Sequence, residues 1–342
     1  MALIKEIKLS TESYKIFINE NIESFFKKNK IGQKYAIITD DKVKKLYAIK
    51  LKNELQKNKI EAEIFSFKNG EKQKTINTLE TLANQMVEKG FDRKDAIIAL
   101  GGGVVGDLAG FLASTYMRGI PYIQVPTTLL AMVDSSIGGK TGVDISSGKN
   151  LLGTFHQPQA VLINTNYLQT LSQQQIKNGV GEIIKYGVIS SKQLFEYLEK
   201  NMQNILDLKE ENINYIIKKS VIIKAEIVEQ DEKESNIRMI LNYGHTYGHA
   251  IEKISNYKLL HGYAVAIGMV IANKIAVEEK ILKQTDSERI KNLIKLAGLP
   301  TTTLHKPKLK DLLSDKKKEG NFISFILPTK IGEAVIKKTQ CQ

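Results

Sequence analysis

Three of the five histidines in the chain lie between positions 245 and 261, a spacing that could hold a metal ion. His245 and His249 are four positions apart in LNYGHTYGHAIE, so on a helix both rings would lie on one face. His261 follows in LLHGYAVAIGM. Imidazole is a common ligand of divalent metals, but histidines also pack in cores. Three interpretations of the cluster therefore stay open: a metal site, a substrate site, or histidines packed in the core. The zinc-protease motif is absent, because Thr246 stands where that motif needs glutamate.

A catalytic zinc ion needs three protein ligands and an open position, and a carboxylate is the natural third ligand. Glu182 is the best candidate, because it stands among glycines and apolar residues in NGVGEIIKYG, where a charge without a partner would be costly. Lys185 follows one helical turn later. Lys224 interrupts an apolar stripe at positions 213, 217, 221 and 228. Each lysine is either part of a site or a buried stem with its ammonium group in water.

A glycine-rich turn in the first half of the chain could bind a pyrophosphate. AIIALGGGVVGDLAG places glycines at positions 101, 103 and 106 between an expected strand and an expected helix. The acid that a dinucleotide fingerprint needs about 20 residues later is missing, although Asp40 ends an earlier strand. A dinucleotide site and a tight turn without ligand both remain open. A second turn, NGEKQKT, could bring Glu71 and Lys74 to the same edge.

The segment 133–158, VDSSIGGKTGVDISSGKNLLGTFHQP, has five glycines and almost no regular pattern. We expect a long loop here, and such loops in compact domains are usually functional. Its polar side chains include Asp134, Lys140, Lys149 and Asn150, and the two lysines suit a phosphate.

These residues would be positioned by an α/β half followed by a mostly helical half. Strand patterns alternate with helical patterns, and the first 20 residues form an expected edge hairpin. The strands are expected at 34–39, 60–67, 95–100, 122–125 and 160–164, and the helices at 43–57, 75–89, 105–115 and 127–134. Later segments are helical until FISFILP. We predict a doubly wound, mostly parallel, dinucleotide-binding α/β domain over 1–165 and a mostly α-helical metal-binding domain over 166–342, with the cleft between them.

Composition limits the classes of protein that fit. The chain has 342 residues, of which 42% are hydrophobic, which favours a large core over disorder. The single cysteine, Cys341, excludes internal disulfides and cysteine zinc sites and predicts a cytoplasmic location. The opening MALIKEIKLSTESYK lacks a secretory signal pattern, and no apolar run is long enough to predict a membrane span.

The formal net charge is +13, but the lysines are scattered. This pattern favours a solvated surface or the steering of anionic substrates over nucleic-acid binding. Two of the four arginines, Arg118 and Arg238, stand in apolar, glycine-flanked sequence. There a planar guanidinium group suits a phosphate or a carboxylate.

Taken together, the motifs resemble the 3-dehydroquinate synthase family over nearly the whole chain. The resemblance is carried by GGGVVGDLAGF, YMRGIP, VPTTLLAMVDSSIGGKTGVD, GKNLLGTFHQP, GVGEIIKYG, LNYGHTYGHAIE and LLHGYAVAIGM. It implies an NAD-binding α/β domain, a helical metal-binding domain, an active site between them, and a homodimer. One departure is Tyr263, where the family usually has glutamate.

The resemblance also implies site residues. The metal, zinc or cobalt, would be held by Glu182, His245 and His261, and His249 would be a substrate and proton-relay residue. NAD would be bound by Asp40, Glu71, Lys74, Gly103, Val104, Val105, Gly106, Asp107, Thr127, Thr128, Lys140 and Lys149. Substrate and phosphate would be held by Asp134, Lys140, Asn150, Asn242 and His249, with Arg118 from a neighbouring subunit. Lys185, Lys224 and Arg238 would face the carboxylate and hydroxyl end, and Lys317 would close on the phosphate.

The implied reaction converts 3-deoxy-D-arabino-heptulosonate 7-phosphate to 3-dehydroquinate and phosphate in the shikimate pathway of aromatic amino acid biosynthesis. It comprises oxidation by NAD, phosphate elimination, return of the hydride, ring opening and an intramolecular aldol step. NAD would therefore be used catalytically. The alternatives are a related sugar-phosphate cyclase, a metal-dependent polyol dehydrogenase and, on charge alone, a nucleic-acid-binding protein.

Overall fold

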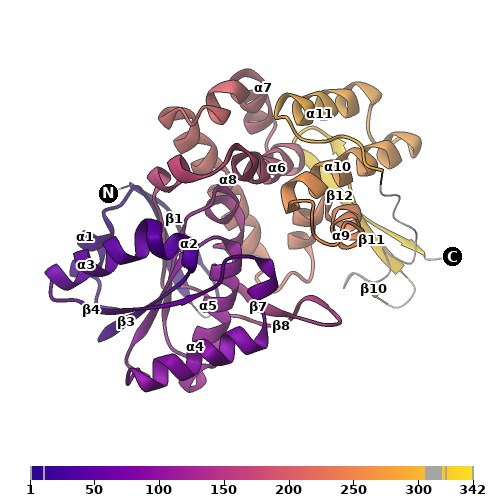
Figure 1. Ribbon diagram of the computed structural model, residues 1–342. Coiled ribbons are helices and arrows are strands. Elements are labelled where there is room, and N and C mark those ends of the chain that lie inside the picture. Colours follow the sequence, from indigo (N-terminus) through magenta and orange to yellow (C-terminus); the bar gives the residue numbers. More distant parts are fainter. Residues whose placement is uncertain (1, 11, 305–317, 320–321, 341–342) are drawn as a thin grey trace. The chain divides into compact units, whose positions relative to one another are not determined.

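The computed structural model describes residues 2–10, 12–304, 318–319 and 322–340, and it divides into two compact units, Met1–Thr170 and Leu171–Gln342 (Figure 1). The sequence pattern placed the boundary after residue 165, whereas the division comes after the short helix that follows the last strand of the first unit.

The first unit contains a seven-stranded sheet in its described part. From edge to edge its strands are β1 (Ala2–Lys8), β2 (Ser13–Ile18), β9 (Ala160–Ile163), β6 (Tyr122–Pro126), β5 (Ala96–Gly101), β3 (Lys34–Asp40) and β4 (Glu61–Phe67). Only β1 and β2 pair antiparallel, which confirms the expected edge hairpin. The central strands are apolar runs buried on both faces, as parallel sheets require.

Helices cover both faces of this sheet, which confirms the predicted α/β class. Ile97 and Ala99 of β5 pack into one core, and Ile98 and Leu100 pack into the other, as the period of two in a strand demands. The helical segments are α1 (Ile22–Lys28), α2 (Asp41–Val43), η1 (Lys44–Ala48), α3 (Ile49–Lys57), η2 (Glu71–Gln73), α4 (Ile76–Glu88), α5 (Gly103–Thr115), η3 (Tyr116–Arg118), η4 (Ala131–Ser135) and η5 (Thr165–Thr170).

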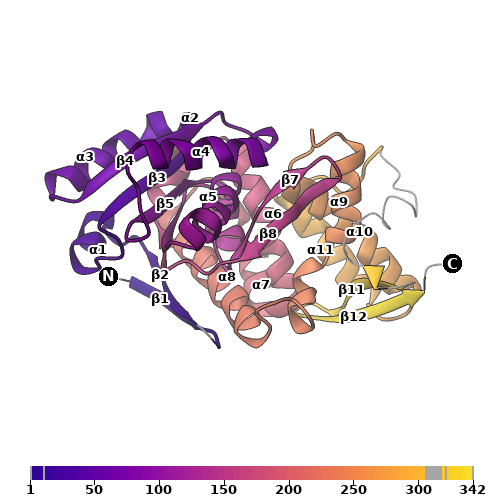
Figure 2. The same cartoon turned by 90° about the horizontal axis from the view of Figure 1, so that it is seen from below.

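The prediction of a long loop over 133–158 is wrong. Much of this segment forms a two-stranded antiparallel ribbon of β7 (Lys140–Ile145) and β8 (Gly148–Phe155) (Figure 2). Its glycines allow two backbones to approach closely. A Cβ atom on Gly142 would lie 2.5 Å from the Leu152 carbonyl oxygen, and one on Gly153 would lie 2.0 Å from that of Thr141. The glycines that looked like loop residues are therefore pairing residues. The helix expected at 127–134 is also shifted, since its last turn is the π-helical η4.

The second unit is mostly helical, as predicted, and its described part ends in a three-stranded antiparallel sheet. Its helices are α6 (Gln173–Ser190), α7 (Lys192–Leu206), α8 (Glu210–Gln230), η6 (Ile237–Asn242), α9 (His245–Ile254), α10 (His261–Glu278) and α11 (Gln284–Leu296). Its strands are β10 (Lys318–Glu319), β11 (Phe322–Lys330) and β12 (Glu333–Gln340); the sequence pattern indicated only β11. The side chain of Ser172 caps α6 by accepting from the Gln175 amide, as the capping-box pattern predicted.

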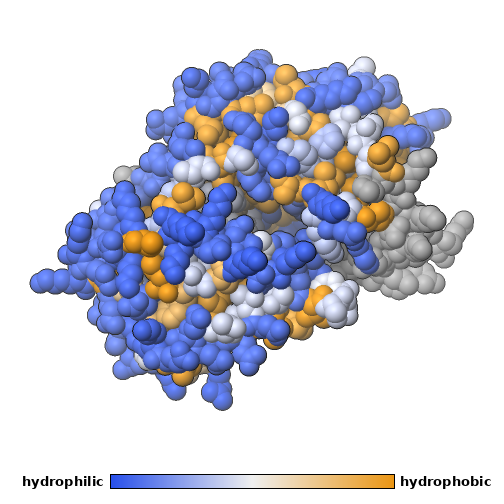
Figure 3. Space-filling model, viewed as in Figure 1, coloured by the Kyte–Doolittle hydropathy of each residue, from blue (hydrophilic) through white to orange (hydrophobic). Residues whose placement is uncertain are grey.

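Among the described residues, no helix has the length and apolar character needed to cross a membrane. The face drawn in Figure 3 is mostly hydrophilic, with small scattered groups of apolar side chains, as the lysine-rich composition predicts.

Candidate metal and nucleotide sites

The metal-ligand candidates lie on three helices of the second unit that pack through glycines. A Cβ atom on Gly262 of α10 would lie 2.0 Å from the Asn178 carbonyl oxygen of α6, and one on Gly268 would lie 1.9 Å from that of Gly244. The Gly262 amide also donates to the Asn178 side chain at 2.7 Å. Gly244, before α9, has a φ of +79°, which favours glycine. Close packing of these backbones brings the first residues of α9 and α10 to the middle of α6.

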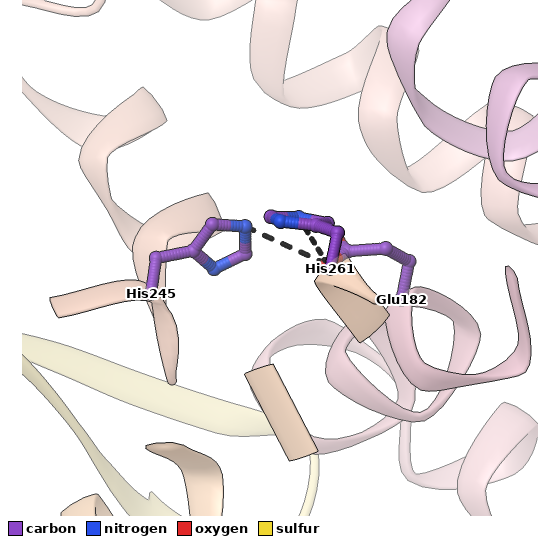
Figure 4. Close-up of side chains that lie close together, drawn as sticks. All are labelled: Glu182, His245 and His261. Atoms are coloured by element: carbon purple, nitrogen blue, oxygen red, sulfur yellow. Dashed lines mark ion pairs between the residues drawn. The ribbon is translucent and has the colours of Figure 1, made fainter. Parts of the chain in front are cut away.

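Three donor atoms converge there. Oε1 of the fully buried Glu182 lies 3.5 Å from Nε2 of His245 and 3.3 Å from Nε2 of His261 (Figure 4). The potential ligand atoms of these residues all lie within 4.8 Å of one another. Two imidazoles and one carboxylate form a donor set typical of catalytic zinc sites. The structure thus brings together the three residues expected to hold the metal.

Both imidazoles are also held on the side away from Glu182. Nδ1 of His245 lies 3.0 Å from the Tyr243 carbonyl oxygen, and Nδ1 of His261 lies 3.2 Å from Oε2 of Glu252. Metal-binding histidines are usually oriented in this way, with Nδ1–H donating to an oxygen and Nε2 facing the metal. The donor set and its supports therefore fit a divalent cation.

Charge in the cluster favours a cation. Burial lowers the pKa of His261, but hydrogen bonds with Glu182 and Glu252 outweigh burial and raise the pKa to about 10. Two carboxylates thus attract a proton to the place where a metal ion would compete for it.

The sequence left open whether the ammonium group of Lys185 belongs to a site or lies in water. The structure excludes water. The side chain of Lys185 is 2% exposed, and Nζ lies 2.5 Å from Oε2 of Glu182. Lys224 of α8 is also buried.

His249 lies one helical turn after His245, as the spacing predicted. Its ring centroid is 5.3 Å from that of His245 and 5.9 Å from that of His261. Ligand atoms of His249, Glu252 and His261 form a second convergent group. Glu252 was not expected from the sequence, and its role shows only through its contact with His261 of α10.

The loop before α9 holds the expected Arg238 and Asn242. Asp231 organises it, because its carboxylate accepts from the backbone amides of Ser235, Asn236 and Arg238. The Arg238 guanidinium donates to the Glu232 carbonyl oxygen, and the Asn242 amide donates to Glu234 at 2.8 Å. Asp231 and Glu234 were not singled out from the sequence, where they read only as part of a charged stretch.

In the first unit, the glycine-rich turn leads from β5 into α5. Gly102 precedes α5 without a side-chain cap, so its first backbone amides lack a side-chain partner from the cap residue. A Cβ atom on Gly106 would lie 2.9 Å from Oε1 of Gln124. This glycine-rich helix start, which also includes Val104 and Val105, suits a pyrophosphate that approaches the backbone.

Other expected NAD residues surround the same sheet edge. The Thr127 amide donates to the Gly101 carbonyl oxygen at 2.9 Å, and Thr128 accepts from the Ala131 amide. Asp40, at the end of β3, accepts from the amides of Lys42 and Val43. Because β3, β5 and β6 are parallel neighbours, their carboxyl ends meet at one edge, where ligands of such folds bind.

A charge cluster joins the second turn to α5 and to the ribbon. Nζ of the buried Lys74 lies 2.9 Å from Oδ2 of Asp107, 3.8 Å from Oε1 of Glu71 and 3.8 Å from Oδ1 of Asp144. Glu71 also pairs with Lys149 at 3.1 Å. Burial lowers the pKa of Lys74, but the surrounding carboxylates outweigh burial and raise it. Asp144 was not expected from the sequence.

The remaining expected residues are more dispersed. Asp134 lies in η4, and Lys140 is exposed at the start of β7. Asn150 has a φ of 52°, and its amide donates to Oδ1 of Asp144. Arg118 follows Met117 in η3, both with positive φ. Lys317 lies outside the described residues.

Comparisons with known proteins point to one family. The 3-dehydroquinate synthase N-terminal model matches residues 64–178, and the 3-dehydroquinate synthase C-terminal model matches residues 179–319. A protein named 3-dehydroquinate synthase from Prochlorococcus marinus subsp. pastoris is 46% identical over 345 residues, which cover 96% of this chain and 94% of that protein.

Two solved structures are similar along almost the whole chain, each at 27% identity. One is 2-deoxy-scyllo-inosose synthase complexed with carbaglucose-6-phosphate, NAD+ and Co2+, with a TM-score of 0.90 over 99% of this chain and 97% of that one. The other is 2-epi-5-epi-valiolone synthase from Streptomyces hygroscopicus subsp. jinggangensis with NAD+ and Zn2+ bound, with a TM-score of 0.87 over 97% of this chain and 94% of that one.

Proposed function

The chain belongs to the 3-dehydroquinate synthase family, and we propose that it converts 3-deoxy-D-arabino-heptulosonate 7-phosphate to 3-dehydroquinate and phosphate with NAD and one zinc or cobalt ion. The observation that carries this proposal is the convergence of Glu182, His245 and His261 on one point, with a supporting contact behind each imidazole. Related structures with NAD+ and a divalent metal add support.

Glu182, His245 and His261 would hold the metal, which would act as a Lewis acid on a substrate hydroxyl and on the ketone formed from it. The supports fix the tautomer of both imidazoles, so Nε2 is the nitrogen that faces the ion. His249 lies beside both rings, where its imidazole can bind a substrate oxygen and exchange a proton with it.

The glycine-rich turn and the charge cluster of Lys74 would hold NAD, which would take a hydride from one ring alcohol and return it within the same cycle. The α5 amides would bind the pyrophosphate, and Glu71, whose position Lys74 and Lys149 fix, would accept from a ribose hydroxyl.

Cationic and amide side chains would bind the two anionic ends of the substrate. Lys140 and Asn150 on the ribbon, with Asp134, would position the phosphate and neighbouring hydroxyls. Arg238 and Lys224 would meet the carboxylate end, since guanidinium and ammonium groups bind carboxylates, and Asn242 would help to hold the phosphate and neighbouring hydroxyls. The expected active site between the two units and the role of Lys317 stay predictions.

Phosphate release from the heptulosonate phosphate tests the function directly. We expect release with no lasting rise in NADH absorbance, and we expect EDTA to stop it. Stoichiometric NADH formation would instead indicate a polyol dehydrogenase. Release from a different sugar phosphate, with none from this substrate, would indicate another cyclase.

We also propose a homodimer in which the partner's copy of Arg118 reaches the substrate. The support is a set of apolar residues, at least a third exposed, in the ribbon and in η3: Met117, Ile145, Leu151, Leu152 and Phe155. Leu152→Lys should give monomers in sedimentation experiments and lower activity, whereas Val87→Lys, at an exposed position on α4, should not. An unchanged dimer with Leu152→Lys would contradict this proposal. The cytoplasmic location stays a prediction.

A further inference from the structure

Each expected metal ligand has two atoms that could face a cation, and in each the second atom contacts another group of the chain. Nδ1 of His245 lies at the Tyr243 carbonyl oxygen, and Nδ1 of His261 lies at Glu252. For Glu182 the second atom is Oε2, and Nζ of Lys185 lies 2.5 Å from it. The atoms that converge are therefore Oε1 of Glu182 and the Nε2 atoms of His245 and His261.

The contact between Glu182 and Lys185 is built into α6. The two residues are three positions apart, so their side chains lie on one face of the helix. Glu182 is 0% exposed and the side chain of Lys185 is 2% exposed, so neither head group can turn to water. The Lys185 ammonium also lies 4.8 Å from the ring centroid of Tyr186. Breaking this contact would leave a buried ammonium group without its carboxylate partner, which is costly. The pair is therefore expected to keep its geometry.

A carboxylate can bind a cation through one oxygen or through both. Bidentate binding would fill a position that a catalytic zinc or cobalt ion must keep open for substrate. An ammonium group against Oε2 repels a cation from that oxygen and leaves Oε1 to face the two imidazoles.

We propose that Lys185 is a positioning residue that makes Glu182 a one-oxygen ligand and so keeps coordination positions open for the substrate. This inference rests on the proposed function, because it assumes that the cluster binds a divalent metal. It assigns Lys185 a task beyond the contact with substrate that the family resemblance implies.

The charges give an unusual expectation for Lys185→Met. Loss of a ligand would weaken metal binding, but loss of Lys185 removes a positive charge near the cation and releases a second carboxylate oxygen to it. Metal affinity should therefore be unchanged or tighter, while phosphate release should fall by about 10- to 100-fold, the range typical for residues that support a metal ligand.

The test compares cobalt-loaded wild-type protein with Lys185→Met, Lys185→Gln and Lys185→Arg. Visible absorption reports coordination number, calorimetric titration of metal-free protein with Co2+ reports affinity, and phosphate release reports turnover. Lys185→Met should lose absorption intensity as the coordination number rises. Lys185→Arg, which keeps a cation at the same helix position, should keep more of the wild-type spectrum. Lys185→Gln also removes the positive charge but keeps a polar side chain, so it replaces Lys185→Met in the test if the methionine variant does not fold.

The outcomes separate the inference from the function on which it rests. An unchanged cobalt spectrum in Lys185→Met and Lys185→Gln, with lower turnover, would overturn the inference and leave Lys185 as a substrate residue. Weaker cobalt binding in both variants would also overturn it, since that result indicates a purely structural role. If the wild-type protein bound no cobalt at all, the proposed metal site itself would fail.

Discussion

The carboxylate of Glu252 on α9 lies 3.2 Å from Nδ1 of His261, the first residue of α10. The two helices thus share a hydrogen bond at His261, which we propose as a metal ligand. Two supports fix the ring of His261, this carboxylate on one side and Glu182 on the other.

The first prediction concerns protons. His261 has a pKa raised to about 10, so at pH 7 the metal-free ring is protonated, while a metal ligand must be neutral. We expect metal binding at pH 7 to release about one proton from this ring, and the apparent dissociation constant to fall about tenfold for each unit of rising pH until the pKa is reached. Calorimetry in buffers of different ionisation enthalpy measures the release. A pH-independent affinity between pH 7 and pH 9 would contradict the assignment.

The second prediction concerns the packing of α6 against α10. Gly262→Ala would place Cβ 2.0 Å from the Asn178 carbonyl oxygen, so the two helices must separate. We expect a loss of unfolding free energy of about 1–3 kcal/mol, as overpacking typically costs, together with weaker metal binding. Thermal unfolding and metal titration measure the two effects. Gly148→Ala is the control, because its new Cβ meets only a flexible leucine side chain at 3.1 Å. Equal behaviour of the two variants would reject the packing argument.

The third prediction concerns the buried cation of the first unit. Lys74→Met leaves the carboxylates of Asp107, Glu71 and Asp144 without the ammonium group that they share. We expect the unfolding free energy to fall by about 3–5 kcal/mol, the usual effect of removing one partner from a buried ion pair, and NAD to bind more weakly. Lys72→Met, at an exposed position two residues earlier, should change neither property. NAD titration and chemical unfolding test both, and wild-type NAD affinity in Lys74→Met would exclude this cluster from the nucleotide site.

The fourth prediction concerns the loop that carries Arg238. Burial raises the pKa of Asp231, but three backbone hydrogen bonds and the Ser235 hydroxyl outweigh burial and lower it. A lowered pKa means that the carboxylate stabilises the fold above its unfolded pKa, and that this contribution is lost as the pH falls through the folded pKa.

Asp231→Asn should therefore reduce the unfolding free energy by about 1–3 kcal/mol at pH 7, because the new amide group would face backbone donors. The difference from wild type should shrink in acid. Asp207→Asn, at an exposed helix end, is the control. A difference that stays constant from pH 7 into acid would show that the charge of Asp231 does not matter.

Local patterns predicted much of this molecule. The strands of the α/β unit are mostly apolar runs with helical patterns between them, and the helix that carries Glu182 begins at a recognisable cap. The spacing of His245 and His249 correctly indicated one helical face. It could not decide which of the two meets Glu182, because that depends on how α10 packs against α9, and glycine contacts decide that packing.

The misses have a common physical reason. Glu252 contacts His261 on the next helix, and Asp144 contacts Lys74, which is distant in sequence. No spacing rule links such pairs. The ribbon of β7 and β8 was taken for a loop because glycine signals both flexible turns and close backbone contact, and only the paired strands tell these apart.

We propose that three side chains of the second unit hold one catalytic ion. The sharpest test is to measure metal content and phosphate release in His261→Ala. We expect the variant to lose bound metal and phosphate release together, while NAD affinity stays near that of wild type. A His261→Ala protein that keeps its metal and releases phosphate at the wild-type rate would contradict this proposal.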